Sequence, residues 1–77
     1  MTTSYLEHAM REAEYEVLDG IEAYFGQIPG FNGLYVYAKS ISDCRRELAD
    51  ALIAWINMRM AFNLSIPKLR HYFSEAA

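Results

Sequence analysis

The side chains best suited to metal binding or nucleophilic catalysis are few and far apart in this chain. His8 and His71 stand near opposite ends of the sequence, and neither belongs to a set of ligands spaced as in zinc sites. Cys44 is the only cysteine and has no nearby histidine that would activate its thiol. We therefore expect no metal ion, no cofactor and no catalytic residue.

The densest acidic cluster lies in the first third of the chain and consists of Glu14, Glu16, Asp19 and Glu22. Metal-dependent nucleases hold magnesium between clustered carboxylates. Here the first acidic residues alternate with apolar ones, as on the solvent side of a β-hairpin. We therefore expect these carboxylates to lie on a surface and the protein not to be an enzyme.

Three glycines, Gly26, Gly30 and Gly33, suggest a phosphate-binding loop at first sight. Such loops lie between a strand and the N-terminus of a helix and usually include a lysine. The segment here joins two predicted strands, so its glycines predict turns and a bulge or close backbone approach at Gly26.

The elements that position these residues begin with a helix and a hairpin. Ser4 and Glu7 have the spacing of a capping box, which predicts a helix over residues 4–13. Alternation then predicts a strand from Glu14, and Asp19-Gly20 predicts a two-residue type I′ turn. A second strand is expected over residues 21–28, with Ile21, Ala23 and Phe25 on one face and Glu22, Tyr24 and Gly26 on the other.

The Ile28-Pro29-Gly30-Phe31 segment predicts a type II turn, because proline suits its second position and glycine its third. A third strand follows over residues 34–38, in which Tyr35 and Tyr37 point away from the core. Outward tyrosines are typical of protein interfaces, but cross-strand packing explains them equally well.

Ser40 and Asp43 form a second capping box, which predicts a long helix over residues 41–62. Its main apolar stripe should cover the sheet and comprises Ile41, Cys44, Leu48, Ala51, Leu52, Trp55 and Phe62. Arg59 lies at the centre of this stripe, either extending past the edge of the sheet or reaching an interface. A second stripe, about 130° around the helix, needs another surface. That surface is either the first helix or the same helix of a second subunit, and the stripe comprises Ala49, Ile53, Ile56 and Met60.

The expected fold class is α+β, a small antiparallel sheet of three strands covered by one long helix, with a short N-terminal helix. Residues 1–77 form one domain with its core over residues 14–67. The tail, residues 68–77, begins after Ile66-Pro67 breaks the helix. It is either a fourth, edge strand or a last helical turn.

Composition limits the function classes. Hydrophobic residues make up 53% of the chain, too many for disorder, while ten acidic and seven basic residues give a net charge of −3. This balance makes direct nucleic-acid binding unfavourable, because no basic face can neutralise a run of phosphates. The sequence holds no membrane-spanning stretch or secretion signal, and its single cysteine suits the cytoplasm. A chain of this size is marginal as a monomer, so we expect a homo-oligomer, a dimer or tetramer.

An ordered set of residues resembles the HicB-like antitoxin family over residues 14–67. The set comprises the hairpin, the block Tyr24-Phe25-Gly26-Gln27-Ile28-Pro29-Gly30-Phe31-Asn32-Gly33, the helix start Ser40-Ile41-Ser42-Asp43-Cys44-Arg45, then Leu48, Leu52, Trp55 and Ile66-Pro67. The resemblance implies a partial ribonuclease H-like fold, assembled as oligomers. Structural roles would fall to Gly26, Ile28, Gly33, Cys44, Leu48, Leu52, Trp55 and Pro67. The expected form is a short one without the C-terminal DNA-binding module of many relatives, so the repressor role is not carried over.

By this resemblance the chain would bind and occlude a HicA-type toxin, a small basic ribonuclease that cleaves messenger RNA. Candidate contacts with this partner are Glu14, Glu16, Glu22, Tyr24, Pro29, Gly30 and Phe31. The alternative is a stand-alone homo-oligomeric scaffold without a toxin. Its candidate interface comprises Tyr35, Tyr37, Ala49, Ile53, Ile56 and Met60.

Overall fold

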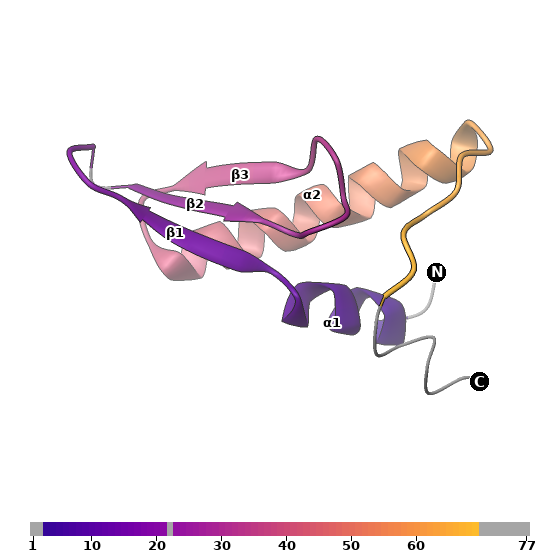
Figure 1. The fold of residues 1–77 in the computed structure, drawn as a ribbon, viewed down its shortest axis with the longest axis horizontal. Helices are drawn as coiled ribbons and strands as arrows, with labels where there is room; N and C mark the ends of the chain where they lie inside the picture. Colours follow the sequence, from indigo (N-terminus) through magenta and orange to yellow (C-terminus); the bar gives the residue numbers. More distant parts are fainter. Residues whose placement is uncertain (1–2, 22, 70–77) are drawn as a thin grey trace.

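The expected α+β architecture is confirmed by a computed structural model, which describes residues 3–21 and 23–69. The elements are α1 (Thr3–Arg11), β1 (Glu14–Leu18), β2 (Ala23–Gln27), β3 (Tyr35–Ala38) and α2 (Ile41–Ala61). The strands form one antiparallel sheet in the order β1-β2-β3. In Figure 1, α2 crosses behind the sheet and projects beyond it, and the chain after α2 runs back towards α1. The described residues contain three strands, and residues 70–77, where most of the candidate fourth strand falls, lie outside them.

The long helix begins and ends at residues whose chemistry explains the boundary. At its start, the Ser40 hydroxyl accepts a hydrogen bond from the Asp43 backbone N–H at 3.1 Å, as the capping box predicts. At its end, Asn63 adopts a left-handed φ of 57°. The N–H groups of Leu64 and Asn63 then donate to the carbonyls of Arg59 and Met60, at 2.7 and 3.1 Å. These two bonds form a Schellman motif, which satisfies carbonyls that the last turn leaves free.

Two local predictions about the N-terminal half are wrong. Ser4 lies inside α1, which begins at Thr3, so it does not cap this helix. The hairpin loop holds four residues, since Leu18 pairs with Ala23, and β2 therefore begins two residues later than expected. Gly20 has a positive φ of 92°, but no described non-glycine residue other than Asn63 does. A type I′ turn needs positive φ at both central positions, and Asp19 does not supply it.

The core lies between the sheet and one stripe of α2, formed by four residues at intervals of four: Cys44, Leu48, Leu52 and Ile56. The buried cluster is completed by Tyr5, Ala9, Ile28, Phe31, Leu34 and Leu69. The buried side of α2 is therefore rotated from the predicted main stripe towards the predicted second stripe. Ile56 moves into the core, whereas Phe62, placed on that stripe by its spacing, is 71% exposed at the projecting end of α2.

Gly26 allows the helix to approach the sheet closely. A Cβ atom at this position would stand 2.9 Å from the Cys44 sulfur and 3.2 Å from the Tyr15 ring. Such a contact is closer than side chains tolerate, so a residue without a side chain is required here. The expected close backbone approach at Gly26 is thus what the structure contains.

The loop between β2 and β3 is fixed to α2 by Trp55. Its ring lies 5.0 Å from that of Phe31, and its indole N–H donates to the Asn32 carbonyl at 3.0 Å. The Phe31 N–H donates to the Ile28 carbonyl, and Gly30 has a φ of 89°, as a type II turn requires. These contacts fix the start of β3 on the helix.

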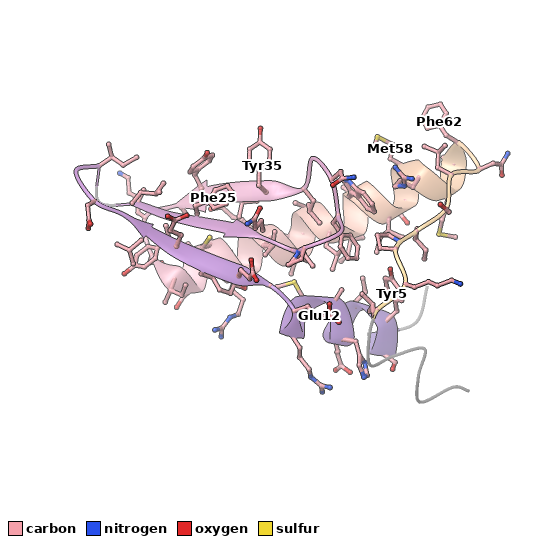
Figure 2. All side chains as sticks on the ribbon, viewed as in Figure 1. Tyr5, Glu12, Phe25, Tyr35, Met58 and Phe62 are labelled. Atoms are coloured by element: carbon pink, nitrogen blue, oxygen red, sulfur yellow. The ribbon has the colours of Figure 1, made fainter. Side chains whose placement is uncertain are left out.

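The first helix and the chain after α2 close the other end of the core. Tyr5 is buried, and its hydroxyl donates to the Pro67 carbonyl (Figure 2). Burial, with the negative charge of Glu12, raises the pKa of this hydroxyl, so it stays protonated and able to donate. Of the two surfaces expected to cover the second stripe of α2, α1 contacts the helix within this chain.

Candidate functional site

Among the described residues, no helix covers one face of the sheet. Gly26, on β2, faces α2, so its neighbours Phe25 and Gln27 face the opposite way. The pairing of the strands then places two rows of side chains on this second face. One row is Glu16, Phe25 and Tyr37, and the other is Glu14, Gln27 and Tyr35. We call these six residues the outer face.

Three aromatic rings gather on the outer face. The Phe25 ring lies 5.2 Å from that of Tyr37 and 6.0 Å from that of Tyr35, and the two tyrosine rings meet edge to face at 6.0 Å. Tyr35 and Tyr37 remain 55% and 57% exposed. The Tyr35 side chain points away from α2 in Figure 2. The rings therefore pack across strands, as one of the two explanations expects, and still leave an exposed aromatic surface.

The charge of the outer face has one sign. Glu14 and Glu16 are exposed on β1, and no lysine or arginine shares the six positions. Within the described residues, the ion pair found is between Arg46 and Asp43 on α2, so neither glutamate has a cationic neighbour at ion-pair distance. Carboxylates beside exposed rings favour a cationic, partly apolar partner.

The other expected partner contacts do not share this surface. Tyr24 faces the α2 side of the sheet, where it lines a hollow of about 470 Å³ with Val17 and Lys39. Pro29 and Gly30 are exposed in their turn, and Glu22 lies outside the described residues. Phe31 is 3% exposed, so its assignment to a partner contact is corrected: its ring belongs to the core beside Trp55.

The second stripe of α2 is divided by the fold. Ile56 is 1% exposed and is removed from the expected oligomer interface, because it packs in the core cluster with Tyr5 and Ala9. Ile53 and Met60 are 45% and 52% exposed, with the half-buried Ala49 beside them. We call Ala49, Ile53 and Met60 the α2 flank. Met58 and Phe62 add further exposed apolar surface at the end of the helix (Figure 2).

Arg59 is engaged within the chain. Its guanidinium carbon lies 5.0 Å from the centre of the Trp55 ring, and its Nε donates to the Ser65 carbonyl at 2.8 Å. This arginine therefore holds the chain after α2 against the helix. Among the residues predicted to be structural, Leu48 and Leu52 are buried, and the Pro67 carbonyl accepts the Tyr5 hydrogen bond.

The Cys44 thiol faces the backbone at Gly26 and is buried. Burial, and secondarily the negative charge of Glu47, raises the pKa of this thiol, which disfavours the reactive thiolate. We predict that dithiobis(nitrobenzoate) at pH 8 reacts with Cys44 about 100-fold more slowly in the native chain than in the urea-unfolded chain, because reaction requires local opening. Equal rates would show that the thiol is accessible, contrary to this packing.

Other kinds of site have no candidates in the described part of the chain. No three histidine, cysteine or carboxylate side chains are placed to hold a metal ion there. In residues 3–21 and 23–69, no helix has the length and apolar character to cross a membrane.

Together these features define a small α+β chain with one long helix behind a sheet and an aromatic, acidic face in front of it. The chain belongs to the UPF0150-like family, whose model matches residues 4–67. It is also similar to a solved structure, the crystal structure of TTHA0281 from Thermus thermophilus. The sequences are 35% identical and the TM-score is 0.82, with 90% of this chain and 85% of the other covered. No match was found among the curated proteins.

Proposed function

We propose that this protein is an antitoxin-type inhibitor that binds a small basic ribonuclease of the HicA type and covers its catalytic surface. The observation that carries the proposal is the outer face, where exposed tyrosines of β3 share one surface with glutamates of β1 that have no cationic neighbour among the described residues. Membership of the UPF0150-like family and the resemblance of residues 14–67 to HicB-like antitoxins support the same function. In this proposal the chain acts by binding and catalyses no reaction.

The mechanism is competition for positive charge. A ribonuclease needs cationic side chains to hold the phosphates of its substrate. The carboxylates of Glu14 and Glu16 offer those cations another partner, while the rings of Tyr35 and Tyr37 supply contact area with little loss of side-chain freedom. Once bound, this chain would exclude RNA from the ribonuclease by occupying its catalytic surface and by neutralising the positive charge of that surface.

The test is co-expression with a small basic protein of the HicA type, such as one encoded beside this chain. We expect the two to co-purify in fixed stoichiometry, and cleavage of messenger RNA by the partner to stop once this chain is in excess. The double variant Tyr35→Ala, Tyr37→Ala should release the ribonuclease activity. A partner that cleaves RNA equally well in the presence of saturating chain would refute the proposal.

The exposed apolar side chains of the α2 flank favour a second function, self-association as a homo-oligomeric scaffold. This self-association would either be the protein's sole function or accompany toxin binding on the outer face. We predict that the double variant Ile53→Glu, Met60→Glu lowers the mass measured by light scattering to that of a smaller assembly. Charges placed on two exposed apolar positions would repel each other across a symmetric contact. Ala54→Glu, at an exposed position about 100° around the same helix from Ile53, should leave the mass unchanged. A double variant with the parental mass would exclude the α2 flank as the interface.

A further inference from the structure

The two rows of the outer face bring one carboxylate next to the aromatic cluster. Glu16 is the cross-strand partner of Phe25, and Phe25 is the partner of Tyr37. Neighbouring strands lie about 4.8 Å apart, and paired side chains start about 5 Å from each other. A planar group stacked on the Phe25 ring, which lies between the other two side chains, would therefore have the Glu16 carboxylate on one side and the Tyr37 ring on the other.

The kind of group that satisfies both contacts is a cation with a flat, weakly hydrated face. A guanidinium stacks on aromatic rings and pairs with a carboxylate through two parallel N–H groups. An ammonium is compact and strongly hydrated, so it meets the carboxylate but gains less from the rings. Arginine therefore fits this surface better than lysine.

Nucleic acid fits the outer face poorly, although aromatic surfaces on other proteins bind single-stranded RNA. Such surfaces combine stacking rings with a positively charged groove that follows the phosphates. The outer face has Glu14 and Glu16 in the corresponding places, and these repel phosphates. The charge thus selects a polypeptide with cationic side chains over RNA.

The chain already contains the same type of contact elsewhere. The Arg59 guanidinium lies over the Trp55 ring at 5.0 Å while its Nε donates to the Ser65 carbonyl. In that pair the ring and a hydrogen-bond acceptor hold one guanidinium between them. The outer face offers rings and a carboxylate acceptor, and no cationic side chain of the described residues occupies it.

We propose that the outer face is an arginine-recognition surface: an arginine of the partner lies on the rings of Phe25 and Tyr37 and pairs with Glu16. This inference rests on the proposed function, whose partner it describes more closely. It assigns selectivity for arginine to Tyr37 and Glu16, and it predicts that the partner's contact surface is rich in arginine as well as positively charged.

The experiment uses two peptides of equal charge, acetyl-hexaarginine amide and acetyl-hexalysine amide, titrated into the 15N-labelled chain and followed by NMR. We expect the arginine peptide to bind about three- to tenfold more tightly, from stacking and paired hydrogen bonds together. The shifted amides should belong to β1, β2 and β3. Equal affinities, or shifts confined to α2, would overturn the inference.

Four variants identify the groups responsible. Tyr37→Ala and Glu16→Gln should each remove most of the preference for arginine, while Tyr37→Phe should keep it because the ring remains. Glu47→Gln removes one exposed carboxylate from α2 and should change either affinity by less than about twofold, since salt screens isolated surface charges. A preference that survives both Tyr37→Ala and Glu16→Gln would contradict the assignment.

The outcomes separate this inference from the function on which it rests. Co-purification and inhibition of a ribonuclease without any preference for arginine would leave the function standing and end the inference. Arginine selectivity in a chain that inhibits no ribonuclease would keep the surface and reject the function. Tighter binding of a uridine oligonucleotide than of either peptide would contradict the charge argument itself.

Discussion

Replacing Ile56 with glutamate is expected to unfold the protein. Ile56 is 1% exposed within the core cluster, so the new carboxylate would lie in apolar surroundings without a partner. An unpaired buried charge of this kind costs several kcal/mol. The whole free energy of unfolding of a 77-residue chain is about 4–12 kcal/mol at 0.05–0.15 kcal/mol per residue. Circular dichroism at 25 °C should therefore show loss of most native helix.

The matched control is Ile53→Glu, three residues away on the same helix. Ile53 is 45% exposed, so its carboxylate would remain in contact with water. At protein concentrations low enough for the chain to be monomeric, we expect urea unfolding to report a change below about 1 kcal/mol, as for most surface substitutions. Comparable destabilisation by the two substitutions would mean that the side of α2 that packs on the core is assigned incorrectly.

Adding one methyl group at Gly26 has the next largest expected effect. The Cβ of Gly26→Ala would meet the Cys44 sulfur at 2.9 Å, and overpacking of this kind costs about 1–3 kcal/mol. Lower entropy of the unfolded chain offsets about 0.5–1 kcal/mol of that cost. Urea unfolding should show a net loss of stability.

A double-mutant cycle identifies the cause. Cys44→Ala removes the sulfur that the new methyl group meets, so Gly26→Ala should cost at least about 1 kcal/mol less in that background. Gly20→Ala is the control, because a Cβ there meets no atom within 4 Å and its cost comes from a φ of 92°. That cost should be the same with and without Cys44. Additive effects of Gly26→Ala and Cys44→Ala would contradict the close approach of helix and sheet.

The parts of the fold that local chemistry determines were predictable from the sequence. The serine cap before α2 and the proline-glycine turn each depend on residues a few positions apart, and both occur as expected. The alternation of β3 correctly placed Tyr35 and Tyr37 facing away from α2. The first capping box failed because the same residue types also occur inside helices, and the sequence alone does not distinguish the two.

The composition of the outer face depended on a loop length that the sequence did not reveal. A two-residue turn at Asp19-Gly20 would have paired Glu16 with Ala23. The four-residue loop shifts the pairing by two positions, which keeps every side chain on its face but sets Glu16 opposite Phe25. The pairing of Glu16 with Phe25 was missed for this reason, whereas the contact of Phe25 with Tyr37 depends on the register between β2 and β3.

Burial of individual apolar residues also needed the tertiary structure. Ile53 and Ile56 belong to one predicted stripe, but only Ile56 packs beside α1 in the core. Phe31 follows a turn, where exposed residues are common, and its burial depends on a helix residue far along the chain, Trp55. A large aromatic residue directly after a proline-glycine turn was the available signal for that packing.

Hydroxyl-radical footprinting of the free chain and of its complex with the co-purified partner tests the central claim most directly. The claim is that the protein partner lies on the outer face of the sheet. Tyr35 and Tyr37 report on that face, while Met58 and Phe62 report on the end of α2, and all four are at least half exposed in the chain. We predict that complex formation lowers oxidation of the two tyrosines and leaves that of Met58 and Phe62 unchanged. Protection of Met58 and Phe62 with unaltered tyrosines would contradict the account.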